Sequence, residues 1–513
     1  MKRLLTLVGT KIIRFFWSWG FLKFCLWTIT LIILFYVEED WRGACAWAAT
    51  KAEWEAKGET FDFNKFIPPP VPDDENLAAI PLFKLAQSAP GNLDFQPSTL
   101  RRAMRDDLSG NELPPRGNWM RGEMPDMAKI RDVIATDYTA AFEGMTLPQD
   151  TIDQFDVLYP LLSDLRAASA TRPFCRFNVD YTILPPFSRS LGSIVAPIQL
   201  SQILTLHAIL ALDHHQSDLA LEDIKINYKL LTGAARDPTL VGGLVAIGVN
   251  AITQGAIFDG LARHAWSDAQ LVELDQILKR INFLSDYQFA FRSEAAESVL
   301  NLDAVEHTPR FQVLKLVNGM SDNATSFELW DHAPFLWPTG WWENNKCLMA
   351  DFGFHEMVTV DANSRRVFPN VDSDLKKYVE KECARWDAKA PWHFWFSESA
   401  PSLDSVTQKY AYGQVWIDEA RIACALERYR LARGVYPGSL EALAPAYIDE
   451  LPHDIMNGQP YHYQLRADGT FLLYSVGWNQ TDDGGKVIYM KNSPTRIDYD
   501  QGDWVWPTPR SSP

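Results

Sequence analysis

The sequence predicts an α+β protein that is mainly α-helical, and three observations support this fold class. The middle of the chain, residues 126–310, consists largely of long segments with the composition and spacing of helices. Residues 405–513 contain one long helical segment followed by short β-rich segments. Residues 15–37 form an apolar run of the length that crosses a lipid bilayer. We therefore expect an N-terminal transmembrane helix, a middle domain of helical hairpins, and a C-terminal long helix packed on a small antiparallel sheet.

The apolar run at residues 15–37 is interrupted by one charged residue, Lys23. Several Lys and Arg residues precede this run, and an acidic stretch at 38–40 follows it. Segments rich in Lys and Arg stay on the cytoplasmic side of a membrane. We therefore expect residues 1–14 to be a cytoplasmic tail and residues 15–37 to be a single-pass anchor in the inner membrane. The bulk of the chain is then periplasmic.

A cleaved signal peptide is the alternative interpretation of this N-terminus. The segment 44–46 (Ala-Cys-Ala) has the small residues that a cleavage site requires. The apolar run is longer than the core of a signal peptide, however, and segment 44–46 lies after the acidic stretch. These two features favour an uncleaved anchor.

Residues 38–125 are expected to connect the anchor with the helical domain. Residues 44–65 have the composition of a polar helix that contains two tryptophans. The segment 68–72 (Pro-Pro-Pro-Val-Pro) then forms a stiff, extended joint, because proline fixes the backbone angle φ. Residues 73–125 mix Pro, Gly and Asn with short helical pieces, and we assign no activity to them.

Residues 126–310 contain four clearly helical segments: Leu191–Leu212, Leu219–Leu231, Thr239–Ala262 and Asp268–Phe291. Short polar turns separate these segments, which favours antiparallel helical hairpins. Residues 191–212 and 239–258 carry no charge and are each long enough to cross a membrane. Polar Gln, His and Asn side chains interrupt both runs, so we expect two buried core helices rather than two further membrane spans.

Residues 311–404 are rich in tryptophan, of which the whole chain contains 19. The densest stretches lie at 335–342 and 392–396. Exposed tryptophans stack on sugar rings or rest at a membrane interface, whereas buried tryptophans fill a core. The core interpretation is the expectation for this region.

The C-terminal region, residues 405–513, begins with a long amphipathic helix. Four apolar residues recur on one face of this helix: Val415, Ile422, Leu426 and Tyr429. Charged residues, Asp418 and Glu419 among them, mostly fall on its other faces. Gly434 supplies the residue that commonly ends a helix, and Pro437 prevents its continuation.

Three β-rich segments follow this helix: 461–465, 470–476 and 487–490. The Asp-Gly pair at 468–469 is a strong signal for a hairpin between the first two of them. A long helix laid across a small antiparallel sheet is a common α+β arrangement. We expect Leu426 and Tyr429 to face the sheet at Tyr463 and Leu473.

Several short motifs occur in order within this region: Ala425-Leu426-x-x-Tyr429-Arg430-Leu431-x-x-Gly434-x-Tyr436-Pro437, Leu451-Pro452-x-Asp454, Gly458-x-Pro460-Tyr461-x-Tyr463, Tyr474-Ser475-x-Gly477 and Asp482-Asp483-Gly484-Gly485. In type and order they are similar to segments of the major pseudopilins of type II secretion systems. The resemblance covers about the last fifth of the chain. It implies a small pseudopilin-like globular module, in which the acidic glycine loop binds calcium.

The chain also departs from the pseudopilin pattern. A pseudopilin carries a hydrophobic assembly helix at the start of this same helix, whereas residues 405–414 are polar and about 400 residues precede them. Gly20-Phe21 before the apolar run resembles a prepilin cleavage site, but Cys25 stands where such a site needs glutamate. The resemblance therefore implies a borrowed globular module rather than a filament subunit.

The candidate metal site is the loop after Tyr474, and calcium is the only cofactor that the sequence leads us to expect. Asn479, Asp482 and Asp483 place three oxygen-bearing side chains within five residues. Nearby glycines allow the backbone to turn so that carbonyl groups can join them. Calcium takes about six to eight oxygen ligands and tolerates irregular geometry. An ordinary turn, in which Asn, Asp and Gly are also common, is the alternative.

Other chemical motifs in the sequence are incomplete. The segment 355–359 (His-Glu-Met-Val-Thr) begins like the zinc motif H-E-x-x-H but lacks its second histidine. The segment 370–375 begins like a calcium loop, but a leucine replaces the glycine that the loop requires. Among six cysteines there is no C-x-x-C pair, and Cys347 with Cys383 is the only disulfide worth testing.

A net charge of −17 argues against nucleic acid as a partner, because binding to phosphate backbones needs a basic face. The leading hypothesis is a membrane-anchored, extracytoplasmic binding or assembly protein of the bacterial envelope without enzymatic activity. Its expected partners are the inner membrane, through residues 15–37, and envelope proteins or glycans. The alternative is an extracytoplasmic hydrolase that acts on envelope glycans. A pocket with two facing carboxylates flanked by tryptophan would favour the enzyme.

Overall fold

The computed structural model describes residues 19–83, 117–142, 146, 148–189, 192–309, 337–385, 391–400, 405–491 and 493–509. About 63% of these described residues are helical and 8% lie in strands, which confirms a mainly helical protein with small antiparallel sheets. The predicted cytoplasmic tail and residues 311–336 of the tryptophan-rich region lie outside the described residues.

The α-helices are α2 (Trp19–Ala56), α5 (Met127–Ala141), α6 (Thr151–Leu158), α7 (Leu161–Thr171), α8 (Gly192–Asp213), α9 (Ser217–Ala235), α10 (Leu240–Ala262), α11 (Asp268–Leu278), α12 (Phe283–Glu306), α14 (Thr339–Glu356), α15 (Pro369–Arg385), α16 (Phe394–Ser399) and α17 (Val406–Arg433). Short 3-10 helices lie at η1 (Phe63–Lys65), η2 (Leu77–Ala79), η3 (Trp119–Arg121), η4 (Pro186–Ser188), η6 (Met357–Thr359), η7 (Pro391–His393) and η9 (Leu440–Ala442).

The helix predicted at Asp268–Phe291 is two helices, α11 and α12, in the structure. Asn282 starts the second helix, because its side-chain Oδ1 accepts a hydrogen bond from the backbone N–H of Ser285 at 3.2 Å. Asparagine is one of the residues most often found at this capping position. The prediction of one helix was therefore wrong at this point, since the capping signal of Asn282 was missed.

The strands are β1 (Val360–Asp361), β2 (Arg366–Val367), β3 (His462–Leu465), β4 (Phe471–Ser475), β5 (Val487–Met490), β6 (Ser493–Gly502) and β7 (Trp504–Trp506). The main sheet has the antiparallel order β3-β4-β7, with Tyr463 opposite Leu473 and Leu473 opposite Trp506. The hairpin predicted around residues 468–469 joins β3 to β4. The segment predicted at 487–490 is β5, which pairs with β6 instead of joining the main sheet.

The chain divides into two compact units. Unit 1 comprises Met1–Phe61, Ser298–Phe352 and Val379–Ser402, and unit 2 comprises Asp62–Glu297, Gly353–Tyr378 and Leu403–Pro513. Most of the predicted helical domain and the C-terminal module therefore belong to the same compact unit.

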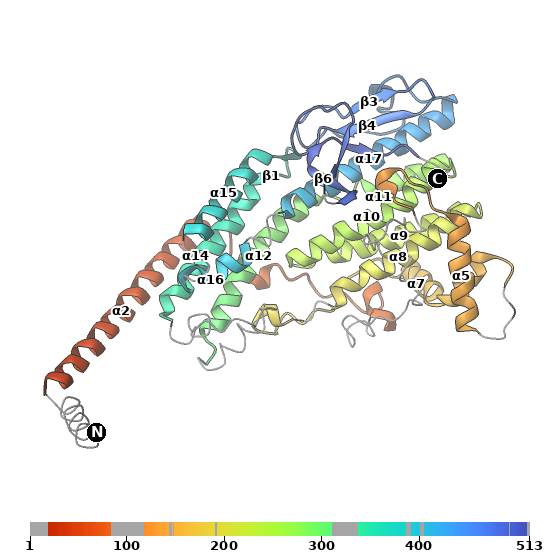
Figure 1. Ribbon diagram of the computed structural model, residues 1–513. Coiled ribbons are helices and arrows are strands. Elements are labelled where there is room, and N and C mark those ends of the chain that lie inside the picture. The colour runs from red at the N-terminus through yellow and green to blue at the C-terminus, as the bar shows by residue number, and fades with distance from the viewer. Residues whose placement is uncertain are drawn as a thin grey trace, which may run out of the picture. The chain divides into compact units, whose positions relative to one another are not determined.

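In unit 1, α2 is one continuous helix of 38 residues, about 57 Å long at the standard rise per residue. It joins the apolar run to the polar helix predicted after it, and Figure 1 shows it extending beyond α14. It is long and apolar enough to cross a membrane, and no residue of its most apolar window is buried. Trp54, near its other end, donates a hydrogen bond from Nε1 to Asp351 Oδ1 of α14 at 2.7 Å.

In unit 2, α8, α9 and α10 lie side by side and form the core of the helical domain (Figure 1). The polar residues that interrupt the charge-free run of α10 are bonded inside this core. Asn250 Oδ1 accepts a hydrogen bond from Tyr228 OH at 3.2 Å and one from Gln254 Nε2 at 3.3 Å. Since α8 and α10 are largely buried in protein, the structure agrees with the expectation of core helices.

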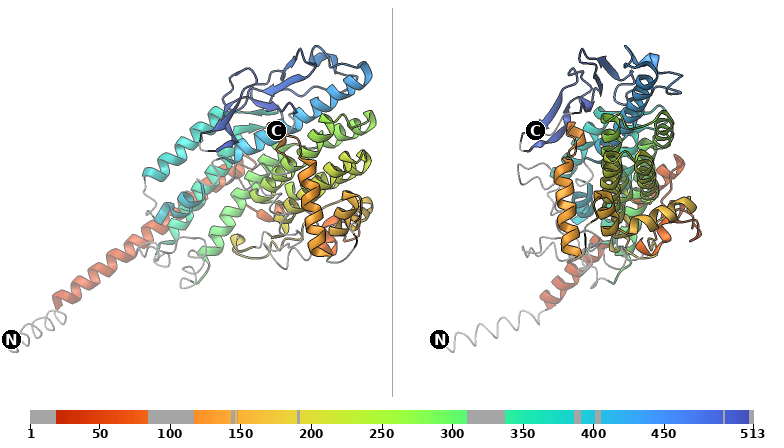
Figure 2. Two further views of the ribbon diagram at one scale, coloured as in Figure 1. Left: turned by 45° about the vertical axis from the view of Figure 1, so that its right-hand side comes forward. Right: turned by 90° about the vertical axis from the view of Figure 1, so that its right-hand side faces the viewer.

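The long helix α17 connects this helical core to the sheet. It packs against α10 and α11 on one side and against β4 and β7 on another, and the blue strands lie next to it in both views of Figure 2. Gly243 of α10 allows a close approach, because a Cβ there would lie 1.6 Å from Tyr410 OH. Residues 406–427 of α17 are almost all buried as a result. Leu426 is completely buried, and the ring of Tyr429 lies 5.2 Å from that of Tyr447.

Candidate functional site

A cavity beside the proline segment has the size and lining of a small-molecule site. Its volume is about 460 Å³, which falls within the usual range of ligand pockets. Residues 68–72 form one wall, and residues 174–177 with the end of α9 form the other. We call this cavity the proline-walled pocket. It lies entirely within unit 2.

Backbone pairing fixes the proline wall to the opposite wall. The backbone N–H of Leu77 donates to Phe174 O at 2.7 Å, and that of Phe174 donates to Glu75 O at 3.1 Å. The side chain of Asn76 donates to Arg176 O at 2.9 Å and accepts from the Arg176 backbone N–H at 2.8 Å. The proline segment is itself stiff, so these bonds hold the two walls in fixed positions.

Asp237 and Tyr181 are polar groups of the pocket that are already bonded to each other. Tyr181 OH donates to Asp237 Oδ2 at 2.5 Å, and Thr239 Oγ1 donates to Asp237 Oδ1 at 2.5 Å. Burial raises the pKa of Asp237, although these hydrogen bonds oppose the shift. Both carboxyl oxygens of Asp237 are therefore engaged in holding the turn between α9 and α10.

Cys175 lines the same pocket but is a poor nucleophile. Burial raises the pKa of its thiol to about 12, although the nearby Lys229 ammonium opposes this shift. A thiol reacts as the thiolate, so Cys175 is unreactive at neutral pH. Its Sγ also lies close to α9, because a Cβ on Gly233 would be 2.9 Å from it.

Two arginines, Arg176 and Arg236, also line the proline-walled pocket. A guanidinium group pairs well with carboxylate or phosphate oxygens. The prolines and the rings of Phe174 and Phe177 supply apolar surface beside them. This combination suits a ligand with an apolar body and one anionic group.

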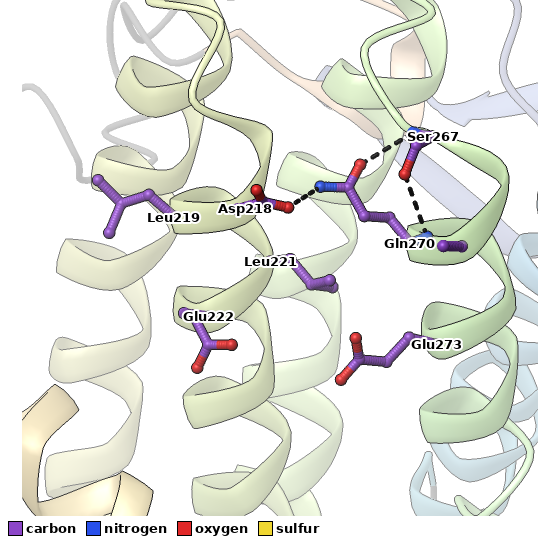
Figure 3. A pocket seen from close by; sticks show the side chains of 8 residues that line it. Asp218, Leu219, Leu221, Glu222, Ser267, Gln270 and Glu273 are labelled. Atoms are coloured by element: carbon purple, nitrogen blue, oxygen red, sulfur yellow. Dashed lines mark hydrogen bonds between the residues drawn. The ribbon is translucent and has the colours of Figure 1, made fainter.

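A second cavity, of about 550 Å³, is an acidic cleft between α9 and α11. Figure 3 shows Glu222 and Glu273 pointing toward each other across it. Lys225 bridges this pair, with Nζ at 2.8 Å from Glu222 Oε1 and 2.9 Å from Glu273 Oε1. At its upper edge Gln270 donates to Asp218 at 2.6 Å (Figure 3). Each carboxylate of the cleft thus has a hydrogen-bond or ion-pair partner within the protein.

A buried histidine, His207 of α8, links four helices of unit 2. Its Nδ1 lies 2.6 Å from Asp223 Oδ2 and its Nε2 lies 3.3 Å from Asp156 Oδ1. Arg166 donates to Asp223 at 2.8 Å. Burial lowers the pKa of His207, but the hydrogen bonds to the two carboxylates outweigh this effect and raise it. Neither of the two cavities above includes His207, so this network serves to lock α6, α7, α8 and α9 together.

The predicted calcium ligands lie in one exposed loop, but each side chain has a partner within the protein. Asn479 Nδ2 donates to Asp483 Oδ2 at 3.0 Å. Asp482 Oδ1 accepts from Tyr474 OH at 2.9 Å and from the backbone N–H of Gly484 at 2.9 Å. These hydrogen bonds lower the pKa of Asp482.

Asp503, which precedes β7, organises this loop. Its carboxylate accepts hydrogen bonds from the backbone N–H groups of Asp483 at 3.2 Å, Gly485 at 2.6 Å and Lys486 at 3.3 Å. Among the described residues, no group of three or more His, Cys, Asp or Glu side chains is placed to hold a metal. Calcium binding by Asn479, Asp482 and Asp483 therefore stays a prediction.

Three carboxyl groups are buried where α17 meets the sheet: Asp418, Glu419 and Asp454. Arg365 donates to both oxygens of Asp418 at 2.8 Å. Asp454 accepts hydrogen bonds from Ser475 Oγ at 2.8 Å and from the Val476 backbone N–H at 2.9 Å. Burial raises the pKa of each of the three carboxyl groups. Tyr461 OH also donates to Asp418 Oδ2 at 3.4 Å, which joins the module to α17.

The incomplete motifs have structural roles. Glu356, from the zinc-like segment, is buried and accepts hydrogen bonds from Tyr287 OH at 3.0 Å and Thr407 Oγ1 at 3.2 Å. The calcium-like segment at 370–375 lies inside the helix α15 and does not form a loop. Cys347 is a free, buried thiol, so the disulfide with Cys383 is not formed.

The tryptophan-rich region contains both buried and partly exposed rings. Trp337, Trp342 and Trp395 are buried, which agrees with the core interpretation for these three.

A third cavity, of about 140 Å³, is lined by one tryptophan, Trp119, and one carboxylate, Glu123. None of the three cavities combines two carboxylates with flanking tryptophan, which was the feature expected of a glycan hydrolase.

Comparison with known proteins adds no relative: no family model, no curated protein and no solved structure matches this chain.

Proposed function

We propose that the chain is a membrane-anchored, extracytoplasmic binding or assembly protein of the bacterial envelope that performs no catalysis. In this proposal α2 crosses the inner membrane once, with the N-terminus in the cytoplasm and the chain after residue 38 in the periplasm. The observation that carries it is the uncovered apolar half of α2. Its side chains are exposed at Trp19, Leu22, Phe24, Leu26, Trp27, Ile29, Leu31, Ile32, Ile33, Leu34, Phe35 and Val37.

An apolar surface of this extent is unfavourable in water, so it needs a partner. A bilayer is a suitable partner because about 20 apolar residues in a helix match its hydrocarbon thickness. The surface also surrounds the helix rather than forming one stripe, which distinguishes a lipid-facing helix from one that packs on protein. Acidic residues begin immediately after Val37, where the polar side of the membrane would start.

The position of residues 44–46 supports an uncleaved anchor. They lie in the middle of α2, and a Cβ at the neighbouring Gly43 would be 2.3 Å from Gly340 O. A chain cut there would lose the contacts that Glu39, Asp40 and Gly43 make with the start of α14. We therefore propose that α2 remains intact in the mature protein.

The C-terminal region, in this proposal, is a borrowed pseudopilin-like module that has lost filament assembly. The first half of α17 supports this interpretation because it is buried among the helices of unit 2. A pseudopilin needs the corresponding segment to be free for assembly. The module then serves to build unit 2, and the proline-walled pocket is the proposed ligand site.

A fusion experiment tests the anchor. A reporter that is active only in the periplasm, joined after residue 60, should be active, and a cytoplasmic reporter at the same point should be silent. Removing residues 15–37 from the first fusion should abolish its activity. The opposite pattern of the two reporters would exclude the proposed topology, and a mature chain that begins near residue 47 would exclude the uncleaved anchor.

A further inference from the structure

The start of α14 contacts α2 at the level where the apolar part of α2 ends. The indole N–H of Trp341 donates to Glu39 Oε2 at 3.0 Å, and the backbone N–H of Gly340 donates to Asp40 Oδ1 at 3.0 Å. The rings of Trp341 and Phe35 lie edge to face, with centroids 6.3 Å apart. Trp341 therefore spans the point at which α2 changes from apolar to acidic.

Backbone contact fixes this level. A Cβ at Gly43 would lie 2.3 Å from Gly340 O, and a Cβ at Gly340 would lie 2.0 Å from Glu39 O. Side chains at either glycine would therefore overlap the opposite helix, since protein interiors are already close-packed. Because α2 and α14 touch through their backbones, Trp341 is held at one position along α2.

Trp341 belongs to a group of four tryptophans in unit 1, which we call the tryptophan cluster: Trp337, Trp341, Trp342 and Trp392. The rings of Trp341 and Trp392 are 5.3 Å apart, and those of Trp337 and Trp342 are 5.2 Å apart. Trp337 and Trp342 are buried, whereas Trp341 and Trp392 are partly exposed. The rings of Trp337 and Trp341 are 6.3 Å apart, so the partly exposed pair packs against the buried pair.

Tryptophan is enriched where a membrane meets water, because its ring is apolar and its N–H bonds to polar groups. Trp341 satisfies both conditions at once, with its ring on Phe35 and its N–H on Glu39. Trp41 of α2 lies one helical turn beyond Val37 and is 68% exposed. Trp41 and Trp341 thus lie at the end of the apolar run, and Trp392 lies against Trp341.

We propose that unit 1 docks on the lipid bilayer surface, with Trp341 and Trp392 of the tryptophan cluster in the headgroup layer of the membrane that α2 crosses. This inference rests on the proposed anchor and adds an interaction surface to it. The cluster sets how deeply α2 sits, because Trp341 cannot move along the helix. Unit 1 therefore contacts the membrane surface directly, in addition to its attachment through α2.

This docking depends on aromatic contact rather than on charge. The boundary acids are already paired within unit 1, since Glu39 accepts from Trp341 and from Arg42, the latter at 2.8 Å, and Asp40 accepts from Gly340. The chain as a whole has a net charge of −17, so anionic lipid would repel it. The docking should therefore occur on zwitterionic lipid and should not weaken with added salt.

Fluorine NMR of the full chain in zwitterionic lipid nanodiscs tests the proposal. All tryptophans are replaced by 5-fluorotryptophan, and each resonance is assigned by its loss in a Trp→Phe variant. Lipids that carry a spin label on the headgroup, or at the end of the acyl chain, then remove signals from nearby indoles. The resonances of Trp341 and Trp392 should be lost with the headgroup label and kept with the chain-end label.

Three other tryptophans make the result decisive. Trp27 in the apolar run should lose its signal with the chain-end label, whereas Trp266 and Trp504, buried in unit 2, should keep theirs with both labels. A Trp341 signal as resistant as that of Trp266, with Trp27 affected, would overturn the docking and leave the anchor standing. A Trp27 signal that survives the chain-end label would overturn the anchor and the docking together. Unshifted Trp266 and Trp504 signals verify that each Phe variant is folded.

Discussion

The indole N–H of Trp54 in α2 donates a hydrogen bond to Asp351 Oδ1 in α14 at 2.7 Å, although the two residues are 297 positions apart in sequence. The Trp54 side chain is buried, and Lys57 Nζ lies 3.9 Å from the centre of its ring. This bond ties the polar half of α2 to the rest of unit 1. The same helix continues into the apolar half. The packing of Trp54 in unit 1 therefore fixes the direction in which the proposed anchor extends.

Trp54→Phe should reduce the stability of unit 1 by about 1–3 kcal/mol, because the Asp351 carboxylate then loses a donor. Trp54→Ala should cost about 3–5 kcal/mol through the additional cavity. Thermal unfolding of the full chain in detergent measures both changes. Trp41→Phe is the matched control, since Trp41 is exposed and should leave the transition within about 0.5 kcal/mol. Equal effects at positions 41 and 54 would contradict the role given to Trp54.

Glu356 should make the folded chain less stable as the pH rises. Burial raises the pKa of this carboxyl to about 7, and the nearby Asp372 charge adds to the shift, against an ordinary value of 4.5. The folded protein then binds a proton that the unfolded chain releases, so this group's stabilising contribution is complete below about pH 4.5 and is lost as the pH rises through about 7. Its size is at most about 3.5 kcal/mol, since each pKa unit corresponds to about 1.4 kcal/mol.

Glu356→Gln tests this dependence, because glutamine is neutral at every pH and still accepts the hydrogen bond from Tyr287. Melting temperatures of the two proteins should be similar near pH 5, and the variant should melt higher near pH 8. Glu450→Gln removes the same charge from an exposed position and is the matched control. If the Glu356→Gln and native curves stay parallel from pH 5 to 8, the carboxyl of Glu356 does not titrate in this range.

The sequence predicted the elements of the C-terminal module better than their surroundings. Gly434 ends α17 with a left-handed φ of 80°, and the Asp-Gly pair at 468–469 forms the tip of the β3–β4 hairpin. Such signals depend on local backbone geometry, which neighbouring residues determine. Asp418 and Glu419 were assigned to faces of α17 away from the apolar one, yet both are buried. A helix covered on several sides buries its polar faces too, and a single periodicity does not reveal this.

Sequence reasoning missed the proline-walled pocket for a related reason. Its walls come from residues 68–72, 174–177 and the end of α9, which are more than 50 residues apart. The proline run itself was recognised as a stiff extended segment. The contact of that segment with Phe174 depends on a pair of backbone hydrogen bonds. Backbone groups are the same in nearly every residue, so residue types do not predict such bonds. In the same way, Asp503 holds the predicted calcium loop because it lies directly before β7. This strand has three residues and was not predicted.

Leu426→Ala should destabilise the protein by about 2–5 kcal/mol, through lost apolar burial and the cavity that remains. Leu426 is completely buried on α17, which packs against both the helices and the sheet of unit 2. Thermal unfolding of the full chain is the measurement, because α17 shares its core with α10 and α11. Leu431→Ala on the same helix is the control, since Leu431 is 44% exposed. An unchanged melt for Leu426→Ala would refute the packing described here.

Calcium should bind the loop that contains Asn479, Asp482 and Asp483. Two adjacent carboxylates repel each other, and a divalent cation with six to eight oxygen ligands would relieve this repulsion. Binding requires Asp482 to release Tyr474 OH and Asp483 to release Asn479 Nδ2, since both are hydrogen-bonded in the structure. We therefore expect weak binding, in the millimolar range typical of extracellular sites.

Calorimetric titration of the full chain with calcium, together with its melting temperature in millimolar calcium, measures this binding. The native chain should release or absorb heat and melt higher, whereas the double variant Asp482→Ala/Asp483→Ala should do neither. Asp498→Ala is the matched control, because it removes an acidic residue of the same C-terminal tail outside the loop. If calcium leaves both the heat and the melting temperature of the native chain unchanged, the loop is an ordinary turn that its own hydrogen bonds and those of Asp503 hold in place.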